Sequence, residues 1–472
     1  MLIEKDKIKH LYNRAGFGLS VNDWQTKSNW KKALDDLFKP SLTYRTLQTI
    51  SLAEVEATKA KMKTLPKEDA KDLKQLLKQN VLELNNLWLQ EMINSEAQLQ
   101  EKMALFWHGH FACRSANPYF DQQYLDIIRE NALGNFSAML REISKTPAML
   151  QFLNNQQNKK DHPNENFARE VMELFTLGRG NYTEQDVKEA ARAFTGYGFD
   201  KTSEFKFRTQ QHDFGTKTFL EKSGNFTGDD ILQIILEKNE CAYFITKKIY
   251  RFFVNDNVDE TIIKQLAAQF YASNYDIKSL MKEIFSSDWF YDEKNIAAKI
   301  KSPIELLVGL SRTIPLVFED EQSTIFIQRS LGQVLLNPPN VAGWPGGRCW
   351  IDSSSLLFRM RLPQVIYYDK DLDFSPKDDI PEQGTMRMKM TDTFIKKLVQ
   401  KKLGAKSDWT NVLQYFSKSI NLTDEISKRV LAKQPAASAT KCIQKNKDTS
   451  SLENEIKSVM IDVLSLPDYQ LC

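Results

Sequence analysis

The sequence predicts a mainly α protein: a large multi-helix domain with a small antiparallel β-hairpin insertion and an ordered Pro/Gly-rich loop. Apolar residues recur at the i, i+3, i+4 spacing of helices along most of the 472 residues. The period-two alternation of strands is confined to residues 196–219, and Gly and Pro concentrate in residues 331–350. With 42% hydrophobic and 26% charged residues, the composition is globular. We therefore expect a folded, soluble protein.

The first helical pattern runs from residue 46 to about residue 106, with leucines on one face. It predicts one long helix, or two helices that break near Pro66. The helix at 164–177 has the clearest boundary signals, because Pro163 suits a first turn and Gly178 suits a stop. Further helices are expected over residues 121–131, 136–144, 184–194, 229–237, 242–253, 260–272, 277–285, 303–312 and 353–368.

Two features interrupt the helices. Residues 196–219 contain Tyr-Gly-Phe, Glu-Phe-Lys-Phe-Arg and Lys-Thr-Phe-Leu, which predict two or three short antiparallel strands. Residues 331–350 hold four Gly and three Pro, too many for regular structure, but their tryptophans are too apolar for a free loop. An ordered loop packed on the core is therefore expected. Its Gly and Pro residues either fix an awkward crossing of the chain, or Trp344, Arg348 and Trp350 line a cleft in which Arg348 binds an anion.

Two stretches have the composition of linkers: residues 371–383, with two prolines among charges, and residues 434–451, rich in Ala, Ser, Thr and Lys. They divide the chain into a main helical domain, residues 1–368, and a C-terminal helical appendage, residues 369–472. The appendage has thin apolar faces that we expect to pack back on the main core. Its helices are expected over residues 394–403, 409–416 and 452–464.

Charge and hydropathy exclude several classes of protein. The 64 Lys and Arg against 61 Asp and Glu give a net charge of +3, too balanced to neutralise a phosphate backbone, so no nucleic acid partner is expected. No run of about 18 apolar residues is present and the mean hydropathy is −0.46, so no membrane span is expected. The N-terminal residues contain no apolar region of a signal peptide. We expect a cytoplasmic protein on the sequence as given, or an exported one if a signal peptide has been removed.

The five cysteines and five histidines were weighed as metal ligands. The cysteines are widely spread without C-x-x-C spacing, so they favour neither a disulfide framework nor a structural zinc site. His108 and His110 flank Gly109, a residue that suits a helix end, and across such a break both rings can face one point. They are then a ligand pair, although a divalent site needs further ligands. Alternatively, they are core histidines with hydrogen-bonded rings.

Two further segments contain residues suited to chemistry. His212 and Asp213 follow the predicted strands and form a ligand pair, a general-base pair or a simple turn. On the helix at 164–177, Asn166, Glu170 and Glu173 follow one stripe at i, i+4, i+7. This stripe is either the carboxylate wall of a pocket or a solvated face, on which Arg169 pairs with carboxylates four residues away.

The chain resembles the bacterial domain-of-unknown-function family numbered 1800 over roughly residues 8–368. Tyr197 stands where the family usually has Trp, and Glu221 where Gly is common. Seven motifs in order carry the resemblance: His-Leu-Tyr-Asn-Arg-Ala-Gly-Phe-Gly, Phe-Trp-His-Gly-His-Phe, Asn-Glu-Asn-Phe-Ala-Arg-Glu-Val-Met-Glu-Leu-Phe-Thr-Leu-Gly, Ala-Arg-Ala-Phe-Thr-Gly, His-Asp-Phe-Gly-Thr-Lys-Thr-Phe-Leu, Lys-Ser-Pro-Ile-Glu-Leu and Gly-Gln-Val-Leu-Leu-Asn-Pro-Pro-Asn-Val-Ala-Gly-Trp-Pro.

The resemblance implies no established activity. It places all the motifs in the main domain, and it implies that the gene often neighbours that of a sulfatase-like or phosphatase-like protein, the expected partner. Many similar proteins look exported. The motif positions with functional side chains are His10, Arg14, His108, His110, Asn166, Arg169, Glu170, Glu173, Arg192, His212, Asp213, Lys217, Trp344 and Trp350.

The first functional hypothesis is a hydrolase, perhaps assisted by a divalent metal such as zinc, manganese or iron. Its metal ligands come from His108, His110, His212 and Asp213. Its catalytic residues are Glu170 or Glu173 as general base, with Arg169 and Lys217. Its substrate-binding residues are His10, Arg14, Asn166, Arg192, Trp344, Arg348 and Trp350. No nucleophile elbow, P-loop or Rossmann fingerprint is present, which disfavours serine hydrolase, nucleotide-driven and NAD chemistry.

The second hypothesis is a non-catalytic helical binding or assembly protein that works with the sulfatase-like partner. Buried and fully satisfied polar networks would then account for the same His, Arg and Glu side chains. The two hypotheses differ in geometry. Histidines and carboxylates that face one open cleft favour the enzyme, whereas sealed rings bonded to the backbone favour the binding protein.

Overall fold

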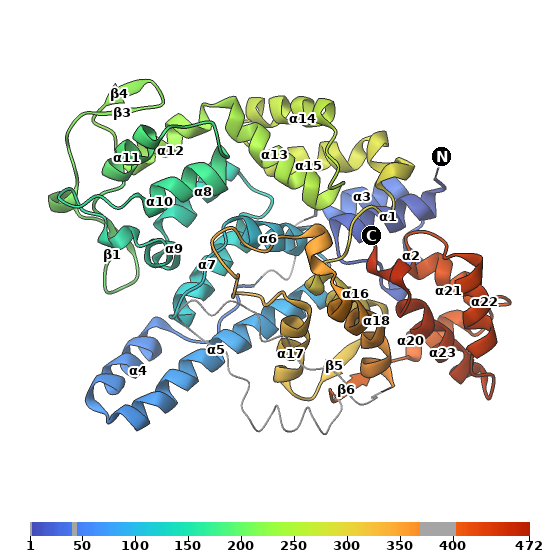
Figure 1. The fold of residues 1–472 in the computed structure, drawn as a ribbon. Coiled ribbons are helices and arrows are strands. Elements are labelled where there is room, and N and C mark those ends of the chain that lie inside the picture. Colours follow the sequence, from blue (N-terminus) through green and yellow to red (C-terminus); the bar gives the residue numbers. More distant parts are fainter. Residues whose placement is uncertain (1, 40–44, 369–402) are drawn as a thin grey trace.

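A computed structural model describes residues 2–39, 45–368 and 403–472 and confirms the mainly α fold (Figure 1). The strands form small antiparallel pairs, and one core of buried side chains extends from Ile8 to Tyr469. Within these residues, no helix is long and apolar enough to cross a membrane.

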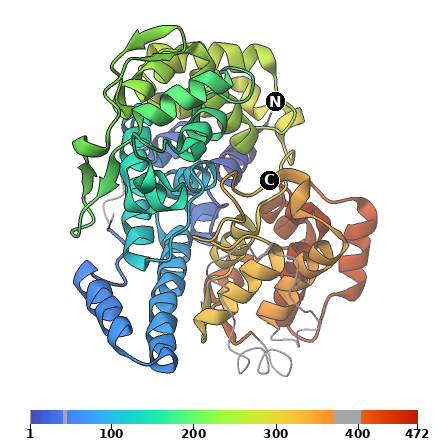
Figure 2. The same cartoon turned by 60° about the vertical axis from the view of Figure 1, so that its left-hand side comes forward.

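The N-terminal helices surround the centre of the molecule. The helical pattern predicted over residues 46–106 is three helices, not one or two. It breaks at Pro66, as expected, and again at Ser95, whose extended backbone ends the second helix. Figures 1 and 2 show the first two of these as a hairpin that projects from one edge of the protein. The elements are α1 (Glu4–Ala15), α2 (Val21–Thr26), α3 (Trp30–Leu37), α4 (Leu52–Thr64), α5 (Lys67–Asn94) and α6 (Gln98–His110).

Most predicted helices of the middle region are present, and side chains cap their first turns. Asn135, Thr146 and Ser302 each accept a hydrogen bond from a backbone N–H of the first turn. These elements are α7 (Pro118–Glu130), α8 (Phe136–Lys145), α9 (Pro147–Phe152), η1 (Asn155–Gln157), α10 (Glu165–Glu170), α11 (Glu184–Ala193), η3 (Thr209–Gln211), α12 (Gly228–Leu236), α13 (Asn239–Phe253), α14 (Glu260–Ala272), α15 (Ile277–Ser286), η4 (Asp288–Tyr291), η5 (Glu293–Asn295) and α16 (Pro303–Thr313).

The helix predicted over residues 164–177 changes type halfway. After α10 it continues as a π-helix, η2 (Val171–Thr176). The Leu177 N–H donates to the Met172 carbonyl over five residues, at 2.8 Å, and the Thr176 hydroxyl donates to the Val171 carbonyl at 2.6 Å. The wider turn rotates later side chains away from the positions of a regular helix. A stripe drawn at 100° per residue through Asn166, Glu170 and Glu173 is therefore wrong beyond Glu170.

The strands form more pairs than the sequence predicts. β1 (Tyr197–Phe199) pairs antiparallel with β2 (Phe205–Phe207), with Gly198 opposite Lys206. β3 (Lys217–Phe219) pairs with β4 (Lys222–Gly224), so the insertion contains two hairpins. The sequence Lys-Ser-Gly of β4 has no apolar alternation to reveal it. A third pair, β5 (Leu316–Phe318) with β6 (Ala405–Ser407), joins segments far apart in the sequence.

The C-terminal region packs beside the main helices (Figure 2). Residues 434–451, predicted as a linker, contain a helix, α22. Residues 371–383 and almost all of 394–403 lie outside the described residues, so the division at residue 368 stays a prediction. The elements are α17 (Glu321–Leu331), η6 (Gly347–Trp350), α18 (Ser353–Tyr367), α20 (Thr410–Phe416), α21 (Leu422–Val430), α22 (Ala437–Asn446), α23 (Leu452–Leu464) and η7 (Pro467–Gln470).

Candidate functional site

Four of the five histidines are sealed inside the protein. Their exposed fractions are 3% for His10, 0% for His108, 3% for His110 and 1% for His212. Because a backbone carbonyl can only accept, the ring nitrogen that contacts it carries the proton. His10 donates through Nε2 to the Phe290 carbonyl at 3.1 Å, and burial lowers the pKa of His10 to about 3. These rings are therefore neutral core groups.

His108 and His110 do not face one point. Helix α6 continues through Gly109 to His110 without the predicted break, so the two side chains leave it in different directions. The His108 ring stacks on Trp344 at 5.4 Å, and neither of its nitrogens has a hydrogen-bond partner among the described residues. The His110 ring donates through Nε2 to the Phe175 carbonyl of η2 at 3.1 Å. Burial holds the pKa of both histidines well below the usual value.

The predicted metal ligands are not assembled. Across the described ranges, no three His, Cys, Asp or Glu side chains come together in a way that could hold a metal ion. His212 instead donates through Nδ1 to the Thr195 carbonyl at 2.9 Å, and Asp213 is bound by an arginine. The residues present therefore do not fit the divalent metal that the sequence led us to expect.

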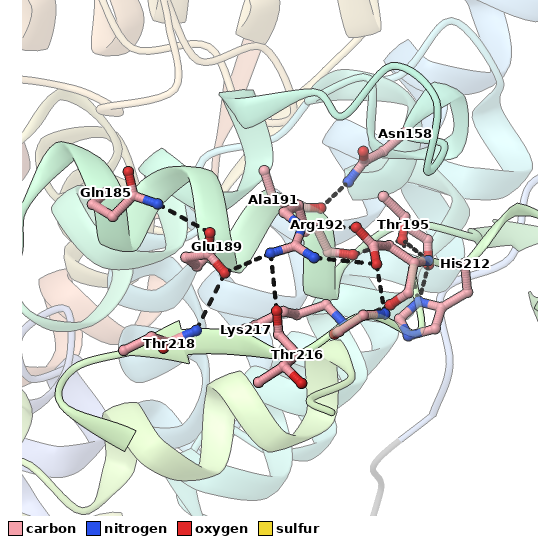
Figure 3. Close-up of polar contacts among 12 residues, drawn as sticks. Asn158, Gln185, Glu189, Ala191, Arg192, Thr195, His212, Thr216, Lys217 and Thr218 are labelled. Atoms are coloured by element: carbon pink, nitrogen blue, oxygen red, sulfur yellow. Dashed lines mark hydrogen bonds and ion pairs between the residues drawn. The ribbon is translucent and has the colours of Figure 1, made fainter. Parts of the chain in front are cut away.

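Figure 3 shows the polar network that holds the His212-Asp213 segment. Arg192 of α11 binds the Asp213 carboxylate with two hydrogen bonds, from Nε at 2.7 Å and from Nη2 at 3.3 Å. Its Nη1 donates to Glu189 at 2.8 Å. The Arg192 guanidinium lowers the pKa of Asp213. An arginine in contact with two carboxylates is a strong, geometrically specific link, and it fixes the loop before β3 to α11.

Lys217 and Thr195 complete this network. Lys217 is fully buried, and its Nζ donates to the Gly215 carbonyl at 3.0 Å and also to the Asp213 carbonyl. The Asp213 N–H donates to the Thr195 hydroxyl at 2.9 Å. Both predicted roles of Lys217, in catalysis and in binding an anion, need a free ammonium. The structure places that ammonium on backbone oxygens instead.

The loop presents one apolar side chain to solvent. Phe214, next to Asp213, is 57% exposed, and its ring contacts the buried His212 ring edge to face at 4.8 Å. Its neighbours on both sides are bound by Arg192 and Lys217. An exposed aromatic ring is therefore held on a loop that has little freedom to move.

The predicted acidic stripe is divided among separate contacts. Arg169 binds Glu184 at 2.7 Å, and also Glu165 as expected. Glu173 accepts hydrogen bonds from the Arg179 guanidinium at 2.6 Å and from the Tyr182 hydroxyl at 3.0 Å.

Two residues of the stripe remain. Glu170 is half-buried with no hydrogen bond to any described residue, and burial, together with the Glu173 charge, raises its pKa. Asn166 donates to the Leu153 carbonyl at 3.3 Å. Glu170 is therefore the one carboxylate of the stripe whose surroundings resemble those of a general acid or base.

The other predicted substrate-binding residues lie apart from this network. Arg14 is 2% exposed and donates to the carbonyls of Phe253 and Cys472 at 2.9 and 2.8 Å, so it ties α1 to distant backbone. Trp344 covers His108, and Trp350 is buried. Arg348 is exposed. The structure therefore brings together Arg192, His212, Asp213 and Lys217 but not the rest.

Sequence reasoning missed two members of the network. Glu189 is buried and accepts hydrogen bonds from Arg192, Gln185 and the Thr218 N–H. It lies three residues before Arg192 on one helix, a spacing that could have revealed the pair. Thr195 belongs to the motif Ala-Arg-Ala-Phe-Thr-Gly, but a hydroxyl that bonds two loops has no local signal.

The comparisons extend the resemblance beyond the predicted limits. No curated protein and no solved structure matches the chain. The family described as "Protein of unknown function (DUF1800)" matches residues 10–471, which includes the C-terminal helices α20 to α23 as well as all seven motifs. Since this match covers nearly the whole sequence, the chain belongs to the DUF1800 family.

Proposed function

We propose that this chain is a non-catalytic binding or assembly protein. One observation carries the proposal: the His, Arg and Lys side chains of its motifs are spent on contacts within the chain. His10, His110 and His212 bond to backbone carbonyls, and Arg192 and Lys217 hold a loop. Satisfied buried networks of this kind specify a rigid structure rather than supply reactive groups.

The face that would meet the partner is the loop that carries Phe214. An aromatic ring on an ordered loop loses little conformational freedom when it binds, because its backbone is already held by Arg192 and Lys217. Aromatic side chains are also enriched among the residues that dominate binding energy. Phe214 at 57% exposure is thus the best anchor in the described network.

The partner proposed here is a sulfatase-like protein encoded beside this chain, as the family resemblance implies. The experiment is co-expression of the two proteins, followed by size-exclusion chromatography and a measured Kd. We expect co-elution of the wild type, and Phe214→Ala should weaken binding by about tenfold or more. Val317→Ala is the matched control, since Val317 is also an exposed apolar residue, at 68%, but lies on β5. Failure of the wild type to co-elute, or equal effects of the two variants, would contradict the proposal.

A second candidate is a hydrolase, favoured by Glu170 alone. A half-buried carboxyl with a raised pKa and no hydrogen bond to a described residue can exchange protons near neutral pH. The experiment is a screen with a phosphoester, a sulfate ester and a peptide substrate. Activity that is lost in Glu170→Gln and kept in Glu165→Gln would support this candidate, because Glu165 is already paired with Arg169. Activity that survives Glu170→Gln would contradict the assignment of Glu170.

A further inference from the structure

Lys248 of α13 has unusual surroundings for a lysine. Its Nζ donates to the Leu174 carbonyl of η2 at 3.3 Å and lies 5.3 Å from the centre of the Phe244 ring. The residue is half-buried, and no described carboxylate forms an ion pair with it. Burial of the ammonium lowers its pKa to about 8. A large fraction of the amine is therefore neutral and nucleophilic at mildly alkaline pH.

The preceding residue provides a direct comparison. Lys247 lies on the same helix, and its Nζ contacts the Glu260 carboxylate at 2.8 Å and the Tyr243 hydroxyl at 3.2 Å. The Glu260 hydrogen bond raises the pKa of Lys247. Two adjacent lysines thus have opposite environments, one ion-paired and charged, the other apolar.

The group beside Lys248 does not compensate its charge. His110 donates to the Phe175 carbonyl, the residue next to Leu174, so the two side chains bond successive carbonyls near the end of η2. His110 is neutral, because burial and the Lys248 charge lower its pKa. The Leu174 carbonyl, near the C-terminal end of the helix, offers only a partial negative charge.

We propose that Lys248 is a site of Nε-acylation by an activated acyl group, an acyl phosphate or an acyl thioester. The neutral amine attacks the acyl carbon and an N–C bond forms. The C–O bond to phosphate or the C–S bond to the thiol breaks, the leaving group departs with the electron pair, and the amine loses one proton. The product suits the site better than the ammonium does. An amide has one N–H, which matches the single described acceptor, Leu174, and carries no charge to desolvate.

The test exposes the intact chain at pH 8 to acetyl phosphate or, in a separate arm, to acetyl coenzyme A. Peptide mass spectrometry then gives the initial rate of acetylation at each lysine. At this pH roughly half of an amine with a pKa of about 8 is neutral, against less than about 1% of an ordinary lysine. We expect Lys248 to react at least about tenfold faster than Lys247 with one or both donors. The arm that reacts identifies the donor class.

Two controls connect the rate to the fold. In denaturant the two lysines should react at equal rates, because both environments are lost. Phe244→Ala should slow the reaction of Lys248 relative to the wild type, since water then solvates the ammonium. Equal or slower acetylation of Lys248 than of Lys247 in the native chain, with both donors, would overturn the proposal.

Discussion

At the scale of single residues, buried imidazoles connect the stability of this protein to pH. His10 and His108 are neutral in the folded chain, with pKa values of about 3. In the unfolded chain a histidine has a pKa of about 6.5. The unfolded state therefore binds more protons below pH ~6.5, and the free energy of unfolding falls as the pH falls from about 6.5 toward 3.

Each of these two histidines should lower the free energy of unfolding by about 2 kcal/mol between pH 7.5 and pH 5. Urea unfolding at both pH values measures the difference. His10→Gln and His108→Gln should each have a smaller drop than the wild type. His162→Gln, which changes an exposed histidine, is the control. Equal drops in all four proteins would contradict the burial of these rings.

One glycine of the Pro/Gly-rich loop has no room for a side chain. Gly343 has a φ of +76°, and a Cβ placed there would lie 2.2 Å from the Gly109 carbonyl oxygen of α6. Gly332 has a φ of +89° but open space around it. Gly332→Ala should cost about 1 kcal/mol for backbone strain, and Gly343→Ala about 2–3 kcal/mol or more because it also displaces the loop. Denaturant unfolding of both variants tests this, and equal costs would show that the loop does not press on α6.

Several of these residues were recognisable in the sequence, but their surroundings were not. The scarcity of histidine drew attention to His108 and His110. Whether the helix ended at Gly109 decided if the two rings converged, and glycine is compatible with either outcome. Lys248 had no motif at all, because an apolar environment made by η2 and Phe244 forms only when distant segments pack.

At the scale of elements, the Arg192 pair fixes the two hairpins to α11. The side chains of Arg192 and Asp213 are 28% and 19% exposed, so their hydrogen bonds are partly shielded from water. A double-mutant cycle of Arg192→Met and Asp213→Asn should give a coupling of about 1–2 kcal/mol. The matched pair is Arg169 with Glu184, where the glutamate side chain is 71% exposed and the coupling should be below about 0.5 kcal/mol. Equal couplings would argue that the Arg192 network is only a surface feature.

The helices were predictable to the extent that their signals are local. Capping residues such as Ser302 and the break at Pro66 can be recognised in a short window of sequence. The π-helix η2 could not be predicted, because its capping groups, His110 and Lys248, come from α6 and α13. The β5–β6 pair joins residues 316–318 to 405–407, and no periodicity in either segment specifies that register.

At the scale of the whole molecule, one core spans both predicted parts of the chain. Arg359 of α18 donates to the Gln470 side chain at 2.9 Å, and the Lys301 N–H donates to the Gln470 carbonyl at 2.8 Å. We expect a single cooperative transition in calorimetry of residues 1–472, and no cooperative transition for residues 1–368 alone. The fragment would leave Arg14 and Arg359 buried without acceptors that they use in the full chain. Two separate transitions in the full chain would instead support independent domains.

The contact between Arg14 and the Cys472 carbonyl has a consequence for biosynthesis. The two residues are 458 positions apart, and translation proceeds at roughly 5–20 residues per second. Helix α1 therefore leaves the ribosome roughly 20–90 seconds before its last bonding partner is made. During that interval its buried arginine and apolar face stay open to solvent and to other proteins, which makes the nascent chain a natural client of chaperones that bind early segments.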